Sequence, residues 1–228
     1  LHANNLQLAR FKIMRISFMG KGGSGKTTLT AAFTKYIALK AENVLAIDGD
    51  VNVHLSEALG MDELAISENE EEIFNYFEGN RHTPIIGTTP PTDDSTFLRV
   101  RPDDPFLQKY STCKDNINLI TVGTYRKSDI GSACYHEKLS SLEMIFHHLL
   151  DTQDDYVVAD FTAGIDSLGT SMHLVADINV FVVEPTNKGL KVYRDFKEKS
   201  EEKNLVTYVV INKVIDQADK DFVAKHFD

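Results

Sequence analysis

Residues 20–28 read GKGGSGKTT, a run made of glycines, lysines and hydroxyl residues. Glycines let a backbone curl so that successive N–H groups point at one anion, which suits the oxygens of a phosphate. In the spacing GxxxxGK[ST], the lysine places its charge on the outer phosphates of a nucleotide and the next hydroxyl ligates Mg²⁺. The run fits that spacing from Gly20 to Lys26 and Thr27. It therefore predicts a phosphate-binding loop, formed by Gly20, Lys21, Gly22, Gly23, Ser24, Gly25, Lys26, Thr27 and Thr28.

Three aspartates stand at the ends of apolar runs. Asp48 closes VLAID and is followed by Asp50, and Asp160 closes YVVAD. Carboxylates at the carboxyl ends of parallel strands face the crevice in which such sheets bind their ligands. We therefore expect the three to lie near the glycine-rich loop. For Asp48 and Asp50 the alternative is a pair of residues that only form a turn.

The elements that must position these residues follow from hydrophobic periodicity. The predicted strands cover residues 15–19, 44–48, 117–122, 156–160, 178–183 and 206–211. The predicted helices cover residues 26–40, 55–59, 66–80, 139–150, 167–175 and 189–203, with a further helical pattern at the end. This alternation indicates an α/β fold with a single doubly wound, mostly parallel sheet and helices on both faces. The glycine-rich loop joins the first strand to the first helix, as in a P-loop NTPase.

We expect one domain over residues 14–228, with 1–13 as an N-terminal extension or a cloning remnant. Residues 66–110 form a predicted irregular insertion, in which 66–80 is an acidic surface helix and 81–105 holds five of the six prolines. The pattern stops abruptly, which points to a truncated C-terminus. We expect His147 and His148 on a helix surface.

Composition limits the partners. The formal net charge is −10, which disfavours a protein that grips nucleic acid by its phosphates. Two cysteines do not make a disulfide scaffold. No apolar stretch reaches the roughly 18 residues of a membrane span, and the N-terminus lacks the apolar core of a signal peptide. We expect a cytoplasmic protein without a membrane or nucleic-acid partner.

The early lysine, Lys21, narrows the prediction. The motif KGGxGKT resembles the deviant Walker A motif of the MinD, ParA and nitrogenase iron protein ATPases. In that family the early lysine crosses the interface of an ATP-bound dimer to the partner's phosphates. The resemblance implies a Mg²⁺-dependent ATPase that forms a homodimer on binding ATP and slowly hydrolyses it to ADP and phosphate. The alternative for Lys21 is a solvated loop lysine.

Further positions match the family in order. By resemblance, Asp48 assists the Mg²⁺ shell, Asp50 orients or activates the attacking water, and Asp160 is the Walker B aspartate. The resemblance also implies that Asn212, in VVINKV, reads the adenine amino group, and that Glu184 and Pro185 lie at the rim of the base pocket. The alternative for Asn212 is a turn residue after a strand.

Within this superfamily the sequence resembles the CooC-like nickel-insertion ATPases. The resemblance rests on DGDVNVHLSEALG, FLRVRPDDPFLQKYS, ADFTAGIDSLG and VVEPTNKGLKV. It implies an accessory ATPase for metallocentre assembly that serves an unidentified client protein. Two other functions stay open, a MinD/ParA-type spatial-positioning ATPase and a metal-free regulatory ATPase.

CooC-like proteins hold metal at the dimer interface with a Cys-x-Cys, and here the matching residues are Cys134 and His136. One such pair from each subunit would give a four-ligand site acceptable to Zn²⁺ or Ni²⁺. The alternative is a small buried cysteine and a histidine in the first turn of a helix.

Overall fold

The computed structural model describes residues 14–78, 91, 95–124, 135–150, 155–163, 172–201 and 205–227. Seven strands form one sheet in the order β3-β4-β2-β5-β1-β6-β7. They are β1 (Met14–Gly20), β2 (Asn43–Asp48), β3 (Thr112–Lys114), β4 (Ile117–Thr121), β5 (Asp155–Ala163), β6 (Ile178–Val183) and β7 (Thr207–Ile211). All neighbouring pairs are parallel except β3 with β4, which is antiparallel.

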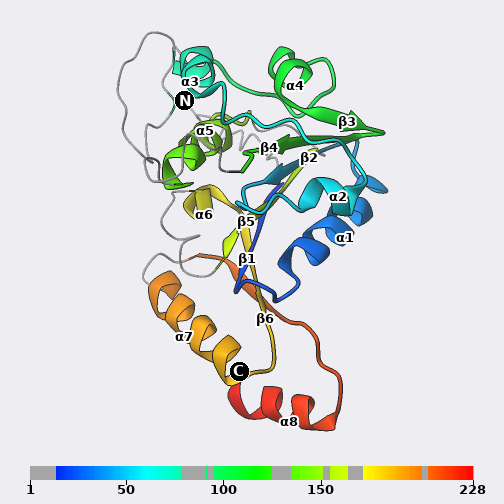
Figure 1. Ribbon diagram of the computed structural model, residues 1–228, viewed down its shortest axis with the longest axis vertical. Coiled ribbons are helices and arrows are strands. Elements are labelled where there is room, and N and C mark those ends of the chain that lie inside the picture. Colours follow the sequence, from blue (N-terminus) through cyan, green and yellow to red (C-terminus); the bar gives the residue numbers. More distant parts are fainter. Residues whose placement is uncertain are drawn as a thin grey trace, which may run out of the picture.

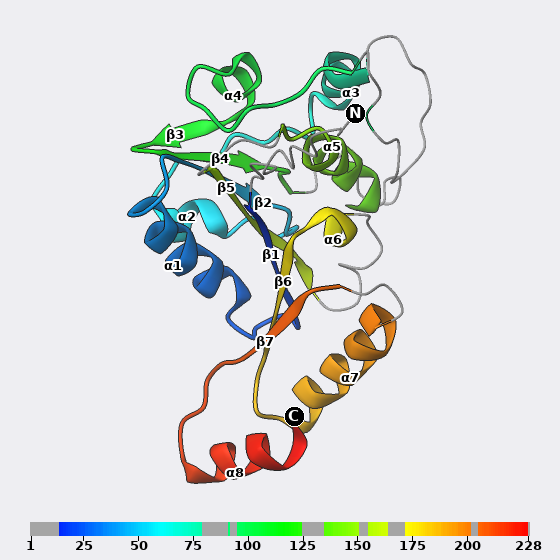
Figure 2. The same cartoon turned by 180° about the vertical axis from the view of Figure 1, so that it is seen from behind.

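Helices cover both faces of this sheet, as Figures 1 and 2 show from opposite sides. They are α1 (Lys26–Ala38), α2 (Leu55–Leu59), α3 (Glu70–Glu78), α4 (Pro105–Tyr110), α5 (Tyr135–His147), α6 (Met172–Val175), α7 (Asn187–Glu201) and α8 (Gln217–His226). The helices α1 and α2 lie on one face, and α5, α6 and α7 lie on the other. This arrangement confirms the predicted doubly wound, mostly parallel α/β fold. None of the described helices is long and apolar enough to cross a bilayer.

The strand side chains alternate between two hydrophobic clusters, one on each face. In β2, Val44 and Ala46 pack with α1 and α2, whereas Leu45 and Ile47 pack toward α3, α4 and α5. All four residues are fully buried. Burial on both faces explains why the strands are unbroken apolar runs in the sequence.

Residues 66–110, which we predicted as an irregular insertion, contain two regular helices, α3 near the start and α4 near the end. The helix α3 is acidic on one side, but Ile73 and Phe77 on its other side are fully buried. The helix is therefore the acidic, amphipathic surface helix that the sequence predicts, in which residues 73 and 77 are one helical turn apart and reach the core together. Residues 79–90 and 92–94 lie outside the described part of the chain.

The helix α4 was missed because it is short. Asp104 caps it, accepting hydrogen bonds from the backbone of Phe106 at 2.9 Å and Leu107 at 3.4 Å, and Pro105 occupies the first helical position. An acidic N-cap followed by proline favours a helix start. The ring of Phe106 lies 4.9 Å from that of Phe77, so α4 and α3 share one aromatic cluster.

His148 corrects another prediction, because it lies inside the molecule. Its side chain is fully buried, and its Nδ1 is 2.7 Å from the carbonyl oxygen of Met144. Its ring centroid is 5.1 Å from that of Phe77. His148 therefore belongs to the aromatic cluster beneath α3.

The strand order brings the predicted functional residues together. The central strand β1 pairs with β5 on one side and β6 on the other, and β5 also pairs with β2. These strands run in parallel, so their carboxyl ends meet at the same edge of the sheet. That edge carries the glycine-rich loop after β1, Asp160 in β5 and Asp48 at the end of β2.

Candidate phosphate-binding site

The loop from Gly20 to Gly25 has a backbone that only glycine can adopt at both ends. Gly20 has φ 148°, and a Cβ there would lie 2.2 Å from the carbonyl oxygen of Val182. Gly25 has φ 90°, and a Cβ there would lie 2.3 Å from Nδ2 of Asn212. The helix α1 begins directly afterwards, without a side-chain cap at Gly25. The free N–H groups of its first turn and its dipole suit an anion at this position.

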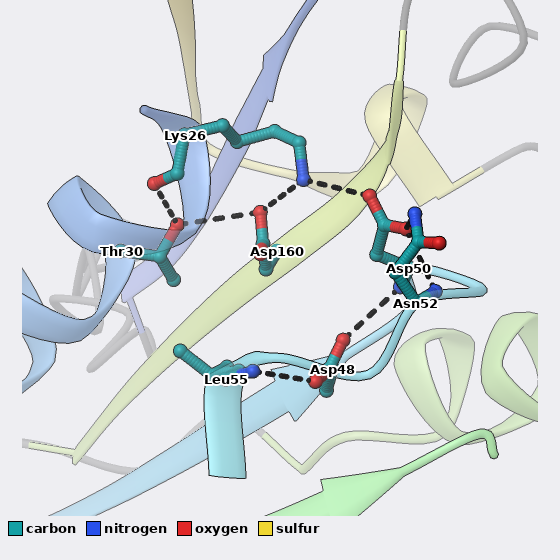
Figure 3. Close-up of polar contacts among 7 residues, drawn as sticks. All are labelled: Lys26, Thr30, Asp48, Asp50, Asn52, Leu55 and Asp160. Carbon is teal, nitrogen blue, oxygen red and sulfur yellow. Dashed lines mark hydrogen bonds and ion pairs between the residues drawn. The ribbon is translucent and has the colours of Figure 1, made fainter. Parts of the chain in front are cut away.

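Lys26 lies at the start of α1 and is held by two carboxylates. Its Nζ is 2.6 Å from Oδ1 of Asp160 and 3.2 Å from Oδ2 of Asp50 (Figure 3). Burial lowers the pKa of Lys26, but the attraction of Asp160 and Asp50 outweighs it, so the pKa is raised. The amine is therefore a charged ammonium at neutral pH, placed where the loop would hold phosphates.

Asp160 is fully buried beside this ammonium. Burial raises the pKa of its carboxyl group, while the charge of Lys26 and hydrogen bonds from Lys26 and Thr27 oppose the rise. Its Oδ1 also lies 3.4 Å from the hydroxyl of Thr30, but its buried Oδ2 has no hydrogen-bond partner among the described residues. A spare carboxylate oxygen close to the hydroxyl of Thr27 is a donor set that suits Mg²⁺.

No three His, Cys, Asp or Glu side chains in the described ranges converge into a complete metal site. Mg²⁺ in a nucleotide site usually takes one or two ligands from the protein and the rest from phosphates and water. Asp160 and Thr27 would be the protein ligands of such an ion.

Asp48 has a different environment from the one we predicted. Its Oδ1 accepts a hydrogen bond from the backbone of Asp50 at 3.1 Å, and its Oδ2 accepts one from Leu55 at 2.9 Å (Figure 3). Burial, followed by repulsion from Asp160, raises the pKa of Asp48 to about 7. Asp48 thus ties the loop after β2 to the start of α2. Its part in the Mg²⁺ shell stays a prediction.

Asp50 divides its two oxygens between two partners. Oδ2 faces Lys26, while Oδ1 accepts hydrogen bonds from the backbone N of Asn52 at 3.0 Å and its Nδ2 at 2.9 Å. Burial raises the pKa of Asp50, but Lys26 and Asn52 outweigh it and the pKa is lowered. The carboxylate is therefore ionised at neutral pH. The motif comparison overlooked Asn52, although an Asp-x-Asn spacing is a known signal for such a turn.

A second cluster of charged side chains is centred on Glu184. Lys213 donates to Oε1 of Glu184 at 2.7 Å and to the carbonyl oxygen of Gly23 at 2.5 Å, and Lys21 lies 3.9 Å from Oε2. The side chain of Lys21 remains 37% exposed. We predicted Glu184 and Lys21 as site residues, but not Lys213. Its position after Asn212 was the only signal for it.

Asn212 follows β7 and reaches the glycine-rich loop directly. Its Nδ2 donates a hydrogen bond to the carbonyl oxygen of Ser24 at 2.8 Å. Pro185 is buried beside Glu184, at the end of β6. The structure therefore brings the predicted adenine-contacting residues to the edge of the same loop.

The predicted transition-metal pair is not placed. Cys134 lies outside the described residues, and His136 is described only as part of the first turn of α5, without its side chain. The other cysteine, Cys113, is exposed in β3, with its sulfur 3.7 Å from the carbonyl oxygen of Asp115.

Comparisons with known proteins agree with this geometry. The CobQ/CobB/MinD/ParA nucleotide binding domain matches residues 16–227. An uncharacterized ATP-binding protein of Methanocaldococcus jannaschii is 29% identical over 217 residues, which are 93% of this chain and 83% of the relative. The carbon monoxide dehydrogenase accessory protein CooC of Rhodospirillum rubrum is 24% identical over 220 residues, or 94% and 80% of the two chains. The cell division ATPase MinD of Pyrococcus furiosus has a similar fold, with a TM-score of 0.56, 20% identity and coverage of 92% and 79%.

Proposed function

Because the chain belongs to the family of CobQ/CobB/MinD/ParA nucleotide-binding domains, we propose that it is an ATPase that forms a homodimer, in which two copies of the chain enclose two molecules of ATP with Mg²⁺. The observation that carries the proposal is the charged Lys26 between Asp160 and Asp50, at 2.6 and 3.2 Å, beside a glycine-rich loop that opens a helix. A buried cation with two acidic partners at this point is suited to exchange carboxylates for phosphates.

Each residue of the site would have its own role in ATP hydrolysis. Lys26 moves from the carboxylates to the outer phosphates of ATP. Asp160 and Thr27 would hold Mg²⁺, which would supply positive charge to the phosphate oxygens. Asp50 orients the attacking water through Oδ2, the oxygen that faces Lys26. The water oxygen would bond to the γ-phosphorus while the bond from that phosphorus to the β–γ bridging oxygen breaks; ADP would leave with the bridging oxygen, and the proton of the water would pass to solvent. We expect slow turnover, since such switches usually await a partner.

The proposal of a dimer rests on Lys21. Its ammonium is 3.9 Å from Glu184, a contact between partly exposed groups that stabilises little. Lys21 is therefore able to leave Glu184 and reach the phosphates bound by a second copy. In this arrangement ATP holds the two copies together, and hydrolysis releases them.

For the biological role we propose an accessory function in metallocentre assembly. Support comes from the relative named as a carbon monoxide dehydrogenase accessory protein, which is similar to this chain over 94% of its length. Cys134 and His136 of two subunits would then carry Zn²⁺ or Ni²⁺ as cargo for a client metalloenzyme.

The nucleotide site is tested by Lys26→Ala. We expect ATP binding or hydrolysis to be lost, because no other described side chain takes the place of the buried ammonium between Asp160 and Asp50. The matched control is Lys35→Ala, a lysine of the same helix whose ammonium contacts the carbonyl oxygen of Ala58 instead. A Lys26→Ala protein that hydrolyses ATP at the normal rate would refute the site.

The metallocentre role is tested separately by metal analysis of the purified dimer with and without ATP. We expect one metal ion per dimer, lost in Cys134→Ser while ATP hydrolysis persists. A metal-free dimer purified without chelator would leave the ATPase in place but remove the metal-assembly role. Binding to liposomes or DNA that depends on ATP would favour a spatial-positioning function instead.

A further inference from the structure

The loop that follows β2 folds back onto the side chain of Asp50. Two donors of Asn52, its backbone N and its Nδ2, converge on Oδ1 at 3.0 and 2.9 Å. The other oxygen, Oδ2, is left facing Lys26 at 3.2 Å (Figure 3). One carboxylate therefore has an oxygen fixed by the loop and an oxygen presented to the phosphate site.

We propose that Asn52 is a positioning residue for ATP hydrolysis, whose side-chain amide holds Asp50 so that Oδ2 faces the attacking water. The proposal rests on the proposed function, in which Asp50 orients that water. Asn52 is exposed, and its hydrogen bonds within the site go to Asp50. It acts through Asp50 and is not itself a catalytic residue.

The physical basis is the rotation of a carboxylate. The terminal torsion of an aspartate is broad and nearly two-fold, so that either oxygen can point forward. Two donors on one oxygen favour a single orientation and limit its spread. Reaction rates depend strongly on such alignment, because a small displacement of the reacting groups removes much of the advantage of holding them together.

The backbone of the same turn is also strained at Val53. Val53, a β-branched residue, has φ 47°, a conformation that such residues rarely adopt. Its N–H donates to the carbonyl oxygen of Asp50 at 3.1 Å, which closes the turn around Asn52. Strain of this kind persists where the surrounding contacts hold the chain in place. Here the contacts of Asn52 and Val53 go to Asp50, while Asp48 holds the same loop through the backbone N–H groups of Asp50 and Leu55.

An Asp-x-Asn turn can also exist only to shape a loop. The two roles are separable because every substitution at position 52 other than proline keeps the backbone N–H, while Asn52→Ala and Asn52→Asp both remove the side-chain donor. Asn52→Asp keeps the size and the turn preference of asparagine. Asn52→Asp also places a second carboxylate beside Asp50, so the two roles are separated by the pattern of losses: a positioning role lowers kcat alone, whereas a shaping role lowers ATP affinity and thermal stability as well.

The experiment compares Asn52→Ala, Asn52→Asp and Asp50→Asn with the matched control His54→Ala. His54 is exposed in the same loop, and its side chain makes no capping bond to α2. For Asn52→Ala we expect kcat with Mg²⁺ and ATP to fall about tenfold, the effect of one hydrogen bond to a charged group, and for Asn52→Asp at least as much, because its carboxylate also repels that of Asp50. The Kd for ATP should stay within about twofold in both, because Asn52 supports the water and not the nucleotide. His54→Ala should behave as the unmodified protein, and the Asn52 variants should keep its thermal midpoint.

Two results would overturn the inference. Normal kcat in Asn52→Asp would show that the amide donor is not needed. A joint loss of kcat, ATP affinity and thermal stability would show that Asn52 only shapes the loop. Failure of the proposed function has a different signature, because Asp50→Asn would then hydrolyse ATP as fast as the unmodified protein.

Discussion

At the scale of single residues, the site depends on carboxyl groups in unlike environments. Asp50 has a lowered pKa because Lys26 and Asn52 outweigh its burial, whereas burial and Asp160 raise the pKa of Asp48 to about 7. These environments come from residues far apart in the sequence, since Lys26 and Asp160 are 134 positions apart. Local motifs could therefore identify the aspartates as candidate site residues. They could not predict that Asp50 faces Lys26 while Asp48 holds the loop after β2.

The raised pKa of Asp48 predicts a pH dependence of stability. An unfolded aspartate has a pKa of about 4, so between about pH 4 and pH 7 the folded protein binds this proton more tightly than the unfolded chain does. The resulting stabilisation is present at low pH and is lost as the pH rises through 7. We expect the free energy of unfolding to fall with rising pH in this window, by up to about 4 kcal/mol from this group.

The measurement is urea unfolding without nucleotide, at several values between pH 5 and pH 8, for the unmodified protein and Asp48→Asn. The asparagine does not titrate, so its curve should lack this decline, whatever its absolute stability. Two parallel curves would mean that Asp48 is ionised throughout the range.

At the scale of elements, the long periodic segments were predictable, and so was the five-residue α2, which ends at Gly60, but β3 and α4 were not. The strands β1, β2 and β6 are largely apolar runs, which the sequence displays directly. The strand β3 has three residues and the helix α4 has six, too few for either period to stand out. The acidic, amphipathic pattern of residues 66–80 did predict α3, although the helix covers only Glu70–Glu78.

The cap of α4 carries a prediction of its own. Asp104 accepts hydrogen bonds from Phe106 and Leu107 through Oδ1, and from Arg99 through Oδ2 at 3.0 Å. Asp104→Ala leaves these N–H groups without the carboxylate and should lower the free energy of unfolding by about 1 to 2 kcal/mol. Asp104→Asn, which still caps well, should lose less. Chemical denaturation measures both, and equal losses would show that the cap contributes little.

At the scale of the whole molecule, the order of the strands determines what can meet. Because β1 lies between β5 and β6, the glycine-rich loop reaches Asp160 on one side and Glu184 on the other. The sequence predicted the doubly wound sheet, since alternating strands and helices allow few arrangements. It could not show that Lys213 bridges Gly23 and Glu184, because that contact joins residues 190 positions apart.

The assembly of two copies is tested through Lys21. We expect Lys21→Ala to weaken ATP-dependent dimerisation by tenfold or more, roughly one ion pair's worth of affinity. Binding of ATP to the single subunit should change little, because Lys26 remains. Sedimentation velocity with and without ATP, over a range of protein concentrations, measures both species. A variant that dimerises normally with ATP would place Lys21 outside the interface.

The ion pairs of Lys26 also affect how strongly the nucleotide-free protein binds small anions. Without a nucleotide the ammonium is already neutralised by Asp160 and Asp50, at 2.6 and 3.2 Å. An incoming phosphate must first separate these charges, so its apparent affinity is reduced by the small fraction of molecules in which they are apart. A lone inorganic phosphate has few other contacts with which to offset that penalty, whereas a triphosphate spans the loop and brings its own cation. We therefore expect the protein to bind inorganic phosphate much more weakly than ATP with Mg²⁺, even where simple phosphate is the more abundant anion.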